Sequence, residues 1–345
     1  MLEFELIKTF FDRGPARKAT LGIGDDCALV DVAPNETLAI STDMLVEGRH
    51  FFADVSPRSL GHKALAVNLS DLAAMGAQAM SFTLSLSLPQ ADSAWLREFS
   101  QGMFELADRY ECELIGGDTT QGPLVLSLTV MGRLPRGVAL RRDGAQVGDD
   151  IWVSGRLGGP YYAVRERYAA MDAMRVGTKS ETSGSPTLAA MLTPFPAHVP
   201  PACIAKLERP EPRLRLGVAL RHLASSAIDI SDGLLGEVGH LCERSRCGAR
   251  IRVDQIPLCD SLSQLHPSVL ALSDWPELLL AGGDEYELCF TAATENRAHI
   301  RRISQDLGLP LSIVGEMTAG GSIDLVDQDD RPVMFHGRAH QHFAS

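Results

Sequence analysis

The chain has 345 residues, of which 45% are hydrophobic, and its formal net charge at pH 7 is −12. This length exceeds the size at which one hydrophobic core usually stops growing, so we expect two domains. The negative charge argues against a nucleic acid or an anionic membrane as the main partner, because such surfaces attract clustered Lys and Arg. The N-terminal residues are acidic, no apolar stretch reaches about 18 residues, and the seven cysteines lack a CxxC pair. These features predict a cytoplasmic protein with reduced thiols and no membrane segment.

The first half of the chain alternates between predicted helices and strands. Hydrophobic spacing predicts helices over residues 3–11, 59–78 and 93–110, and strands over residues 29–32, 37–43, 81–88 and 124–130. Residues 81–88 alternate strictly, with one apolar face and one face of small hydroxyl side chains. The Gly- and Arg-containing connection at residues 135–148 is the best candidate for a domain boundary. We therefore expect an N-terminal domain at residues 1–137 and a C-terminal domain at residues 138–345.

The second half continues the alternation. Strands are predicted over residues 150–154, 227–230, 249–253, 288–291, 311–314 and 322–326, and helices over residues 212–224, 232–244 and 294–307. Residues 170–201 are rich in Ser, Thr and Pro and read as a long loop or partly ordered insertion. Ser231 is expected to cap the helix that follows it, which puts Ser231 and Asp232 at a helix N-terminus that favours phosphate. Helices and strands in this order predict a layered α/β (α+β) fold.

Aspartates recur where the predicted apolar runs end or a helix turns. They fall in five segments, residues 22–26, 41–43, 68–71, 116–119 and 229–233. Any one Gly-Asp pair is most often a turn, but isolated turns do not need so many carboxylates. Mg²⁺ takes oxygen ligands and is usually bound by a few carboxylates together with water and substrate phosphates. The pattern therefore suits a site for Mg²⁺ and a nucleotide.

Other polar residues have two interpretations from the sequence alone. Asn68 and Asp71 share one face of an Ala-rich predicted helix, where they need partners if they are buried. A ligand role for this pair is favoured over an interruption of the helix. Arg141 and Arg142 would usually be solvated, but at a domain joint one of them could clamp phosphate oxygens bidentately. His50 is either a substrate contact or a surface residue.

Familiar nucleotide-binding and hydrolase motifs are absent from the sequence. It contains no G-x-x-x-x-G-K-[ST] loop, no H-R-D or D-F-G kinase motif and no G-x-S-x-G elbow. The chain has only five lysines, none of them in such a loop. Repeated Asp with a Gly-rich backbone and few cations favours phosphoryl transfer in which Mg²⁺, rather than a lysine, neutralises the phosphates.

Taken in order, the motifs resemble those of the thiamine-monophosphate kinase family. They lie at residues 22–26, 41–43, 68–76, 116–119, 228–233 and 282–288, and so span nearly the whole chain. Any one motif is shared with a wider superfamily that includes aminoimidazole ribonucleotide synthetase and selenophosphate synthetase, whereas the ordered set is specific to the kinase. The resemblance implies an aminoimidazole ribonucleotide synthetase-like fold of two domains. It also implies a homodimer, in which the N-terminal sheet pairs with that of a second subunit, and a C-terminal α/β domain that closes over the nucleotide.

The resemblance further implies the reaction and its residues. The γ-phosphate of ATP would be transferred to thiamine monophosphate by direct in-line attack, with several Mg²⁺ ions, no obligate general base and a monovalent cation as a further candidate cofactor. Carried over by position, the implied Mg²⁺ ligands are Asp26, Ser41, Thr42, Asp43, Asp71, Asp118, Asp229 and Asp232. The implied ATP contacts are Gly117, Asp118, Arg142 and Ser231, and the implied substrate contacts are His50, Asp284 and His340.

The chain departs from the family pattern at two places. Residues 282–287 read Gly-Gly-Asp-Glu-Tyr-Glu where the family has Gly-Gly-Glu-Asp-Tyr-Glu, so either Asp284 or Glu285 could reach the substrate. His340 stands where the family usually has an aromatic residue that stacks on thiamine, and imidazole offers a smaller stacking area. The alternatives are another ATP-dependent synthetase of the superfamily and a non-catalytic nucleotide-binding protein. The latter would require the loss of a metal-ligating Asp, and all of these residues are present.

Overall fold

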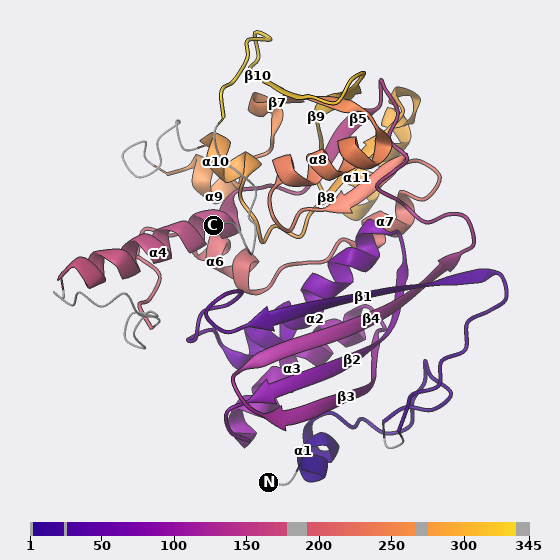
Figure 1. The fold of residues 1–345 in the computed structure, drawn as a ribbon, viewed down its shortest axis with the longest axis vertical. Helices are drawn as coiled ribbons and strands as arrows, with labels where there is room; N and C mark the ends of the chain where they lie inside the picture. Colours follow the sequence, from indigo (N-terminus) through magenta and orange to yellow (C-terminus); the bar gives the residue numbers. More distant parts are fainter. Residues whose placement is uncertain (1–2, 24–25, 178–191, 266–274, 336–345) are drawn as a thin grey trace.

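Two β-sheets, one from each half of the chain, organise the fold (Figure 1). The structure is a computed structural model that describes residues 3–23, 26–177, 192–265 and 275–335. The first sheet has the strand order β1-β4-β2-β3 and consists of β1 (Glu36–Val46), β2 (Gln78–Leu88), β3 (Glu113–Gln121) and β4 (Val125–Pro135). The second has the order β10-β7-β9-β5-β8-β6 and consists of β5 (Asp150–Ser154), β6 (Ser226–Asp229), β7 (Gly248–Arg252), β8 (Leu288–Ala292), β9 (Leu311–Thr318) and β10 (Ile323–Val326).

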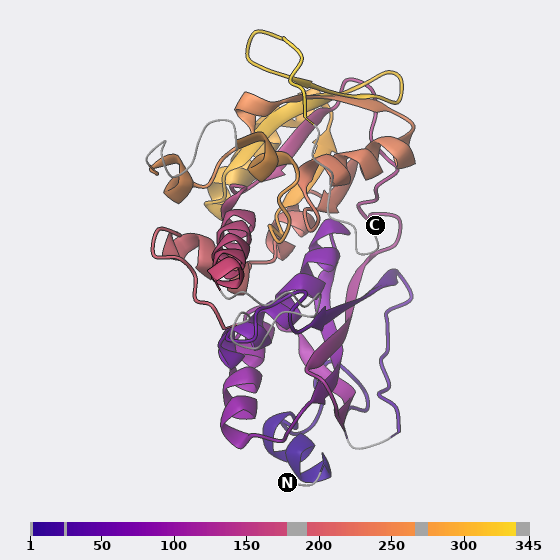
Figure 2. The same ribbon diagram turned by 60° about the vertical axis from the view of Figure 1, so that its left-hand side comes forward.

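The first sheet is covered by helices on one face only. Along β4, buried Leu128 and Val130 alternate with half-buried Ser127 and Thr129, so the strand has one face toward the core and one away from it. Helices α2 (Pro57–Ala74) and α3 (Ser93–Arg109) cover the core face (Figures 1 and 2). Helix α1 (Glu3–Phe10) lies at one end, against α3 and β3. The opposite face presents small hydroxyl side chains together with exposed apolar ones.

Helix α2 is the central element of the fold. Every residue from Ser59 to Ala74 except Asp71 is buried, because α3 and the first sheet pack on it from one domain and α7 (Leu214–Ala219) and β6 from the other. Its N-terminus is fixed by Ser56, whose side chain accepts a hydrogen bond from the backbone N–H of Ser59. An Ala- and Leu-rich sequence with few polar residues suits a helix that is buried along most of its surface.

Glycines allow α2 and α3 to approach closely. A Cβ added at Gly102 would lie 1.9 Å from the backbone oxygen of Arg58, and one at Gly61 would lie 2.0 Å from that of Phe99. We expect Gly102→Ala to lower the free energy of unfolding by about 1–3 kcal/mol, because the helices must move apart. Gly239→Ala in α8 (Leu234–Ser245) is the matched control, since the nearest atom to its Cβ would be 3.8 Å away. Urea unfolding measures both variants, and equal stability of the two would contradict the close approach.

The second sheet is covered on both faces. Ile151, Val153, Ile228 and Cys289 point to one face, where they pack with α8 and with the helices α4 (Gly159–Gly177), α6 (Pro201–Glu208), α9 (Asp260–Ser263) and α10 (Trp275–Leu280). The opposite face joins the core of the first domain through Trp152 and neighbouring residues, with α7 and α11 (Arg297–Leu307) beside it. Short 3-10 helices at Val253–Gln255 and Thr294–Asn296 complete the described elements. The apolar contact between the two domains is therefore continuous with the hydrophobic core of the first domain.

The predicted layered α/β (α+β) arrangement is confirmed. Three predicted elements differ from the structure. Residues 29–32 do not form a strand, because Leu29 makes only an isolated bridge to Leu21. β3 continues through residues 116–119 instead of ending before them. Helix α4 extends to Gly177, so the prediction of a loop from residue 170 is wrong for its first part, and residues 178–191 lie outside the described residues. No helix in the described ranges is long and apolar enough to span a membrane.

Candidate active site

The segment 68–71 of α2 joins elements of both domains. Asn68 Oδ1 accepts from the backbone N–H of Asp43 at 3.0 Å, and Ser41 Oγ donates to Asp71 Oδ2 at 2.5 Å, so both contacts tie α2 to β1. Ser70 Oγ donates to Asp229 Oδ2 at 2.7 Å, which ties α2 to the end of β6. The polar pair Asn68 and Asp71 therefore has the partners that its burial requires.

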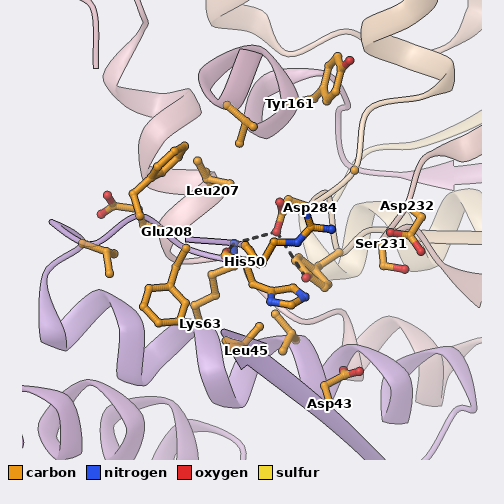
Figure 3. A pocket seen from close by; sticks show the side chains of 18 of the residues that line it. Asp43, Leu45, His50, Lys63, Tyr161, Leu207, Glu208, Ser231, Asp232 and Asp284 are labelled. Carbon is orange, nitrogen blue, oxygen red and sulfur yellow. Dashed lines mark hydrogen bonds and ion pairs between the residues drawn. The ribbon is translucent and has the colours of Figure 1, made fainter. Parts of the chain in front are cut away.

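A cavity of about 1010 Å³ lies between the two domains beside this segment. One end is acidic and is lined by Asp43, Asp71, Asp229 and Asp232, with Thr42 and Ser231 next to them. The other end is mainly apolar and is lined by side chains that include Phe51, Phe52, Val55, Leu207 and Tyr168, with Glu208 beside them (Figure 3). In Figure 3, Asp43, Ser231 and Asp232 lie on one side and Leu207 and Glu208 on the other, with His50, Lys63 and Asp284 between them. The cavity thus offers a charged end and an apolar end to one ligand or to two.

The carboxylates at the acidic end oppose one another's ionisation. Burial raises the pKa of Asp43 to about 6, and the charges of Asp71 and Asp232 add to the effect. Burial and the charge of Asp71 raise the pKa of Asp229 to about 8. Burial also raises the pKa of Asp71, against the hydrogen bond from Ser41 and the charge of Arg142. A bound cation would relieve this repulsion.

The donor set at this end fits Mg²⁺ better than a metal that is held by protein ligands alone. Within the described part of the chain, no three His, Cys, Asp or Glu side chains already converge closely enough to hold a metal ion. Mg²⁺ is commonly bound by one or two carboxylates and completes its shell with water and substrate phosphates. Separate carboxylates around one end of a cavity are consistent with that mode of binding.

Without metal, these carboxylates should destabilise the protein as the pH rises. Their ordinary pKa is 3.8, and their folded-state pKa values are about 6 for Asp43 and about 8 for Asp229. At pH values between the ordinary and the folded-state pKa, the native state therefore binds more protons than the unfolded state. The stability that these two groups contribute is present below the unfolded pKa and is lost as the pH rises through the folded values. In EDTA, we expect a lower Tm at about pH 8 than at about pH 6, and Mg²⁺ should restore it at the higher pH.

The matched control for this pH effect is Asp229→Asn. The variant keeps an oxygen to accept from Ser70 and removes the charge, so its Tm should fall less between the same two pH values. Thermal unfolding of both proteins in EDTA gives the comparison. An identical fall in the wild type and the variant would show that Asp229 does not ionise against its neighbours.

An irregular segment at residues 283–286, just before β8, brings Asp284 to the cavity wall. Its backbone is left-handed at Asp284 (φ 61°) and Tyr286 (φ 50°), and backbone hydrogen bonds to Ser231 and Ile230, both 2.8 Å, hold it in place. Non-glycine residues in this region store strain, which is often found at functional sites. Asp284 lines the cavity, as the motif at residues 282–288 suggested.

Glu285 and Glu287 alternate with these residues and point into the protein. Glu285 accepts from the backbone N–H of Gly158 at 2.5 Å and from Lys206 Nζ at 2.7 Å, and it is 1% exposed. Glu287 accepts from Ser154 Oγ at 2.6 Å and from two nitrogens of Arg213 at 2.6 and 2.7 Å. Burial raises the pKa of Glu285 to about 7, against the charge of Lys206. Of the two carboxylates that the sequence left open, Asp284 therefore faces the cavity and Glu285 does not.

Lys63 is a cavity residue that the sequence reasoning missed. Its Nζ donates to Asp284 Oδ1 at 2.7 Å and to the backbone oxygen of His50 at 3.2 Å, so it brings these two predicted substrate residues to one wall (Figure 3). The ring of His50 is fixed by a hydrogen bond of 3.0 Å from the backbone N–H of Val46 to Nδ1. No local pattern in the sequence identifies it, because residues 60–69 also contain His62 and Asn68.

Three predicted site residues lie elsewhere. Asp26, Gly117 and Asp118 line a second cavity of about 930 Å³ between the N-terminal segment and the first sheet. Asp118 is paired with Ser85, which faces away from α2, whereas Asp43 faces α2. Gly117 is required there, because its φ is 152° and an added Cβ would lie 2.0 Å from the backbone oxygen of Leu84. The described chain therefore does not bring these residues together with the acidic end of the first cavity.

The remaining predicted site residues are Ser231, Arg142 and His340, and the structure supports them to different degrees. Ser231 lines the first cavity, but the prediction that it caps a helix is wrong, because α8 follows Gly233 (φ 115°) and has no side-chain cap. Ser231 Oγ instead donates to Glu237 Oε1 at 3.3 Å. Arg142 lowers the pKa of Asp71, which puts its charge near the acidic end. His340 lies outside the described residues.

Two family models match the chain, one over the first sheet and one over the second sheet apart from β5. Residues 24–134 match the AIR synthase related protein, N-terminal domain, and residues 195–328 match the corresponding C-terminal domain. Together with the two sheets and the cavity between them, these matches make the chain an AIR synthase related protein with the expected two-domain fold.

Similarity to individual proteins identifies the family within this class. The thiamine-monophosphate kinase of Escherichia coli (strain K12) is 43% identical over 345 residues, which cover 99% of this chain and 98% of the relative. The crystal structure of thiamine-monophosphate kinase from Stenotrophomonas maltophilia K279a superposes with a TM-score of 0.76 at 40% identity, covering 96% of both chains. AaThiL complexed with AMPPCP and TMP superposes with a TM-score of 0.70 at 26% identity, covering 98% of this chain and 95% of that one. The chain belongs to the thiamine-monophosphate kinase family.

Proposed function

We propose that this protein transfers the γ-phosphate of ATP to thiamine monophosphate and releases thiamine diphosphate and ADP. The observation that carries the proposal is the cavity between the domains, whose acidic end is built on segment 68–71 of α2 and whose opposite end is apolar. The reacting phosphates require the end with metal-binding carboxylates, and the organic, ring-containing part of the acceptor requires the apolar end. Both environments are therefore needed side by side. The family relatives and the AaThiL complex with AMPPCP and TMP support the same pair of ligands.

Asp43, Asp71, Asp229 and Asp232, with Ser41 nearby, are the residues that would hold Mg²⁺ at this end. The side chain of Thr42, also a predicted ligand, is hydrogen-bonded to Thr129 on the opposite face of the first sheet. Bound there, Mg²⁺ would neutralise the phosphate charge that develops during transfer. The raised pKa values of Asp43 and Asp229 support this assignment, because the carboxylates are charged together most easily beside a cation.

Besides holding the metal, the protein must align the acceptor with the γ-phosphate of ATP. The attacking group is an oxygen of a phosphate monoester, which is already anionic and needs no strong base, so the transfer can proceed in line without a side-chain general base. The apolar end would hold the organic part of the acceptor and exclude water from the reacting phosphates. His50 and Asp284, on the wall between the two ends, are placed to orient the acceptor.

A homodimer is also part of the proposal. The face of the first sheet that α2 and α3 leave uncovered exposes two large apolar side chains of β1, Ile40 by 61% and Met44 by 56%, on either side of Thr42. A second copy packed on this face would also cover the cavity that contains Asp26 and Asp118. The cytoplasmic location and the monovalent cation stay predictions from the sequence.

The test is an ADP-release assay on purified protein with ATP, Mg²⁺ and either thiamine monophosphate or free thiamine, followed by chromatography of the product. We expect thiamine diphosphate, formed from the monophosphate only. Release of ADP without thiamine diphosphate, or turnover only with an aminoimidazole ribonucleotide precursor, would replace the proposed reaction with that of a synthetase of the same superfamily.

A further inference from the structure

Lys63 is a buried lysine whose ammonium group reaches the wall of the first cavity. Its side chain is 3% exposed, and its Nζ is held by Asp284 Oδ1 at 2.7 Å and by the backbone oxygen of His50 at 3.2 Å (Figure 3). Burying a lysine is costly even when it is paired, and an apolar side chain could fill the same place in α2. A charged side chain buried at this position, at the wall of a cavity, therefore indicates a role toward a ligand.

The position of Lys63 along α2 defines what it could contact. Lys63, Val67 and Asp71 are each four residues apart, so they share one face of the helix, and all three line the cavity. Eight residues of helix rise about 12 Å, which places Lys63 about two turns from the acidic end. Beyond Lys63, the wall continues to the apolar end at Phe51 and Leu207.

An acceptor with an organic body and one phosphate that spans these two ends would lie next to Lys63. With the organic body at the apolar end and the phosphate directed to the acidic end, the phosphate would lie beside the ammonium group. Lysine has three N–H donors, and the contacts to Asp284 and His50 use two of them. The third can donate to a phosphate oxygen, while Asp284, whose side chain is 31% exposed, fixes the position of the ammonium group.

We propose that Lys63 is a specificity-determining residue that binds the phosphate of the acceptor and so distinguishes thiamine monophosphate from free thiamine. The inference rests on the proposed function. It goes beyond that function by assigning recognition of the acceptor phosphate to a lysine, where the sequence indicated that Mg²⁺, rather than a lysine, neutralises the phosphates.

The test is the binding of thiamine monophosphate and of free thiamine to the wild type, Lys63→Met and Lys63→Arg, measured by titration calorimetry without ATP. We expect Lys63→Met to weaken monophosphate binding by about 10- to 100-fold, the range for losing a charge-assisted hydrogen bond, and to weaken thiamine binding much less, through the loss of its contacts to Asp284 and His50. Lys63→Arg keeps the charge and should retain more of the binding than Lys63→Met. Lys8→Met, which removes an exposed lysine of α1, is the control for a change in net charge.

The outcomes separate a specific role from a structural one. Unchanged monophosphate binding in Lys63→Met, or an equal loss for both ligands, would overturn the proposal, because a residue that only supports the wall affects both alike. In steady-state kinetics, KM for thiamine monophosphate should rise while KM for ATP does not. Thermal unfolding monitors folding, and Lys63→Gln replaces Lys63→Met if the latter does not fold.

The same experiment distinguishes this proposal from the proposed function. Wild-type protein is assayed in parallel with ATP, Mg²⁺ and thiamine monophosphate. If it forms no thiamine diphosphate, the proposed function is wrong. If it does, and the ratio of the two dissociation constants is the same in the wild type and Lys63→Met, only the role of Lys63 is wrong.

Discussion

Replacing Asp71 by Asn is expected to reduce turnover by about a thousandfold or more, because it removes one of the carboxylates that would hold Mg²⁺ beside the reacting phosphates. A loss of about 4 kcal/mol of charge stabilisation in the transition state corresponds to that factor. Asp71 is central to the acidic end, since it accepts from Ser41 and its charge raises the pKa of both Asp43 and Asp229. Asp43→Asn should have an effect of the same kind.

The fold should not suffer from this substitution. Asn has the same shape as Asp and can still accept from Ser41, while the repulsion with Asp43 and Asp229 disappears, so Tm should stay equal or rise. Asp324→Asn, at an exposed position of β10, is the matched control and should keep full activity. Near-normal turnover of Asp71→Asn at saturating Mg²⁺ would mean that the metal is held elsewhere.

Replacing Glu287 by Ala is expected to lower the free energy of unfolding by about 3–5 kcal/mol, the usual result of removing one partner from a buried ion pair. Glu287 is 1% exposed and is paired with Arg213 at 2.6 Å and with Lys206 at 3.3 Å. Burial alone would raise its pKa, but the charges of Lys206 and Arg213 and the bond from Ser154 outweigh burial and lower it. Its contribution to stability is therefore present above its ordinary pKa and is lost as the pH falls through the depressed value.

Urea unfolding at neutral pH measures this effect. Glu316→Ala is the control, because Glu316 is half exposed and its ion pair with Arg250 is 3.5 Å long, so its loss should change stability by less than about 1 kcal/mol. Glu287→Gln keeps hydrogen-bond acceptors for Arg213 and should fall between the wild type and Glu287→Ala. If Glu287→Ala were no less stable than Glu316→Ala, the ion-pair network behind residues 283–286 would not support the fold.

Local patterns in the sequence were sufficient to predict most elements and to identify the aspartate-containing segments, of which residues 41–43, 68–71 and 229–233 meet at the acidic end. Period-two alternation identifies residues 81–88, and the motif that contains Asn68 and Asp71 predicts a polar segment in an apolar helix. The partners of that segment, Ser41, Asp43 and Asp229, could be proposed from the family motifs but not from spacing. Their contacts depend on how two domains pack on α2, which is a non-local property.

The parts that could not be predicted depend on backbone geometry. The face of the sheet on which Asp118 lies is decided by its register with Ser85, and that register shifts between Phe82 and Thr83. Ser231 fails to cap a helix because Gly233 takes a left-handed conformation between them. Lys63 looks like any helical lysine until the fold buries it against Asp284.

The most direct test of this account is a crystal structure with Mg²⁺, a non-hydrolysable ATP analogue and thiamine monophosphate bound. It should contain Mg²⁺ at the acidic end next to Asp43 and Asp71, the organic part of the acceptor at the apolar end near Phe51 and Leu207, and the acceptor phosphate between them. Thiamine monophosphate bound outside this cavity, or Mg²⁺ without contact to these aspartates, would contradict the assignment of the cavity between the domains as the site of phosphoryl transfer.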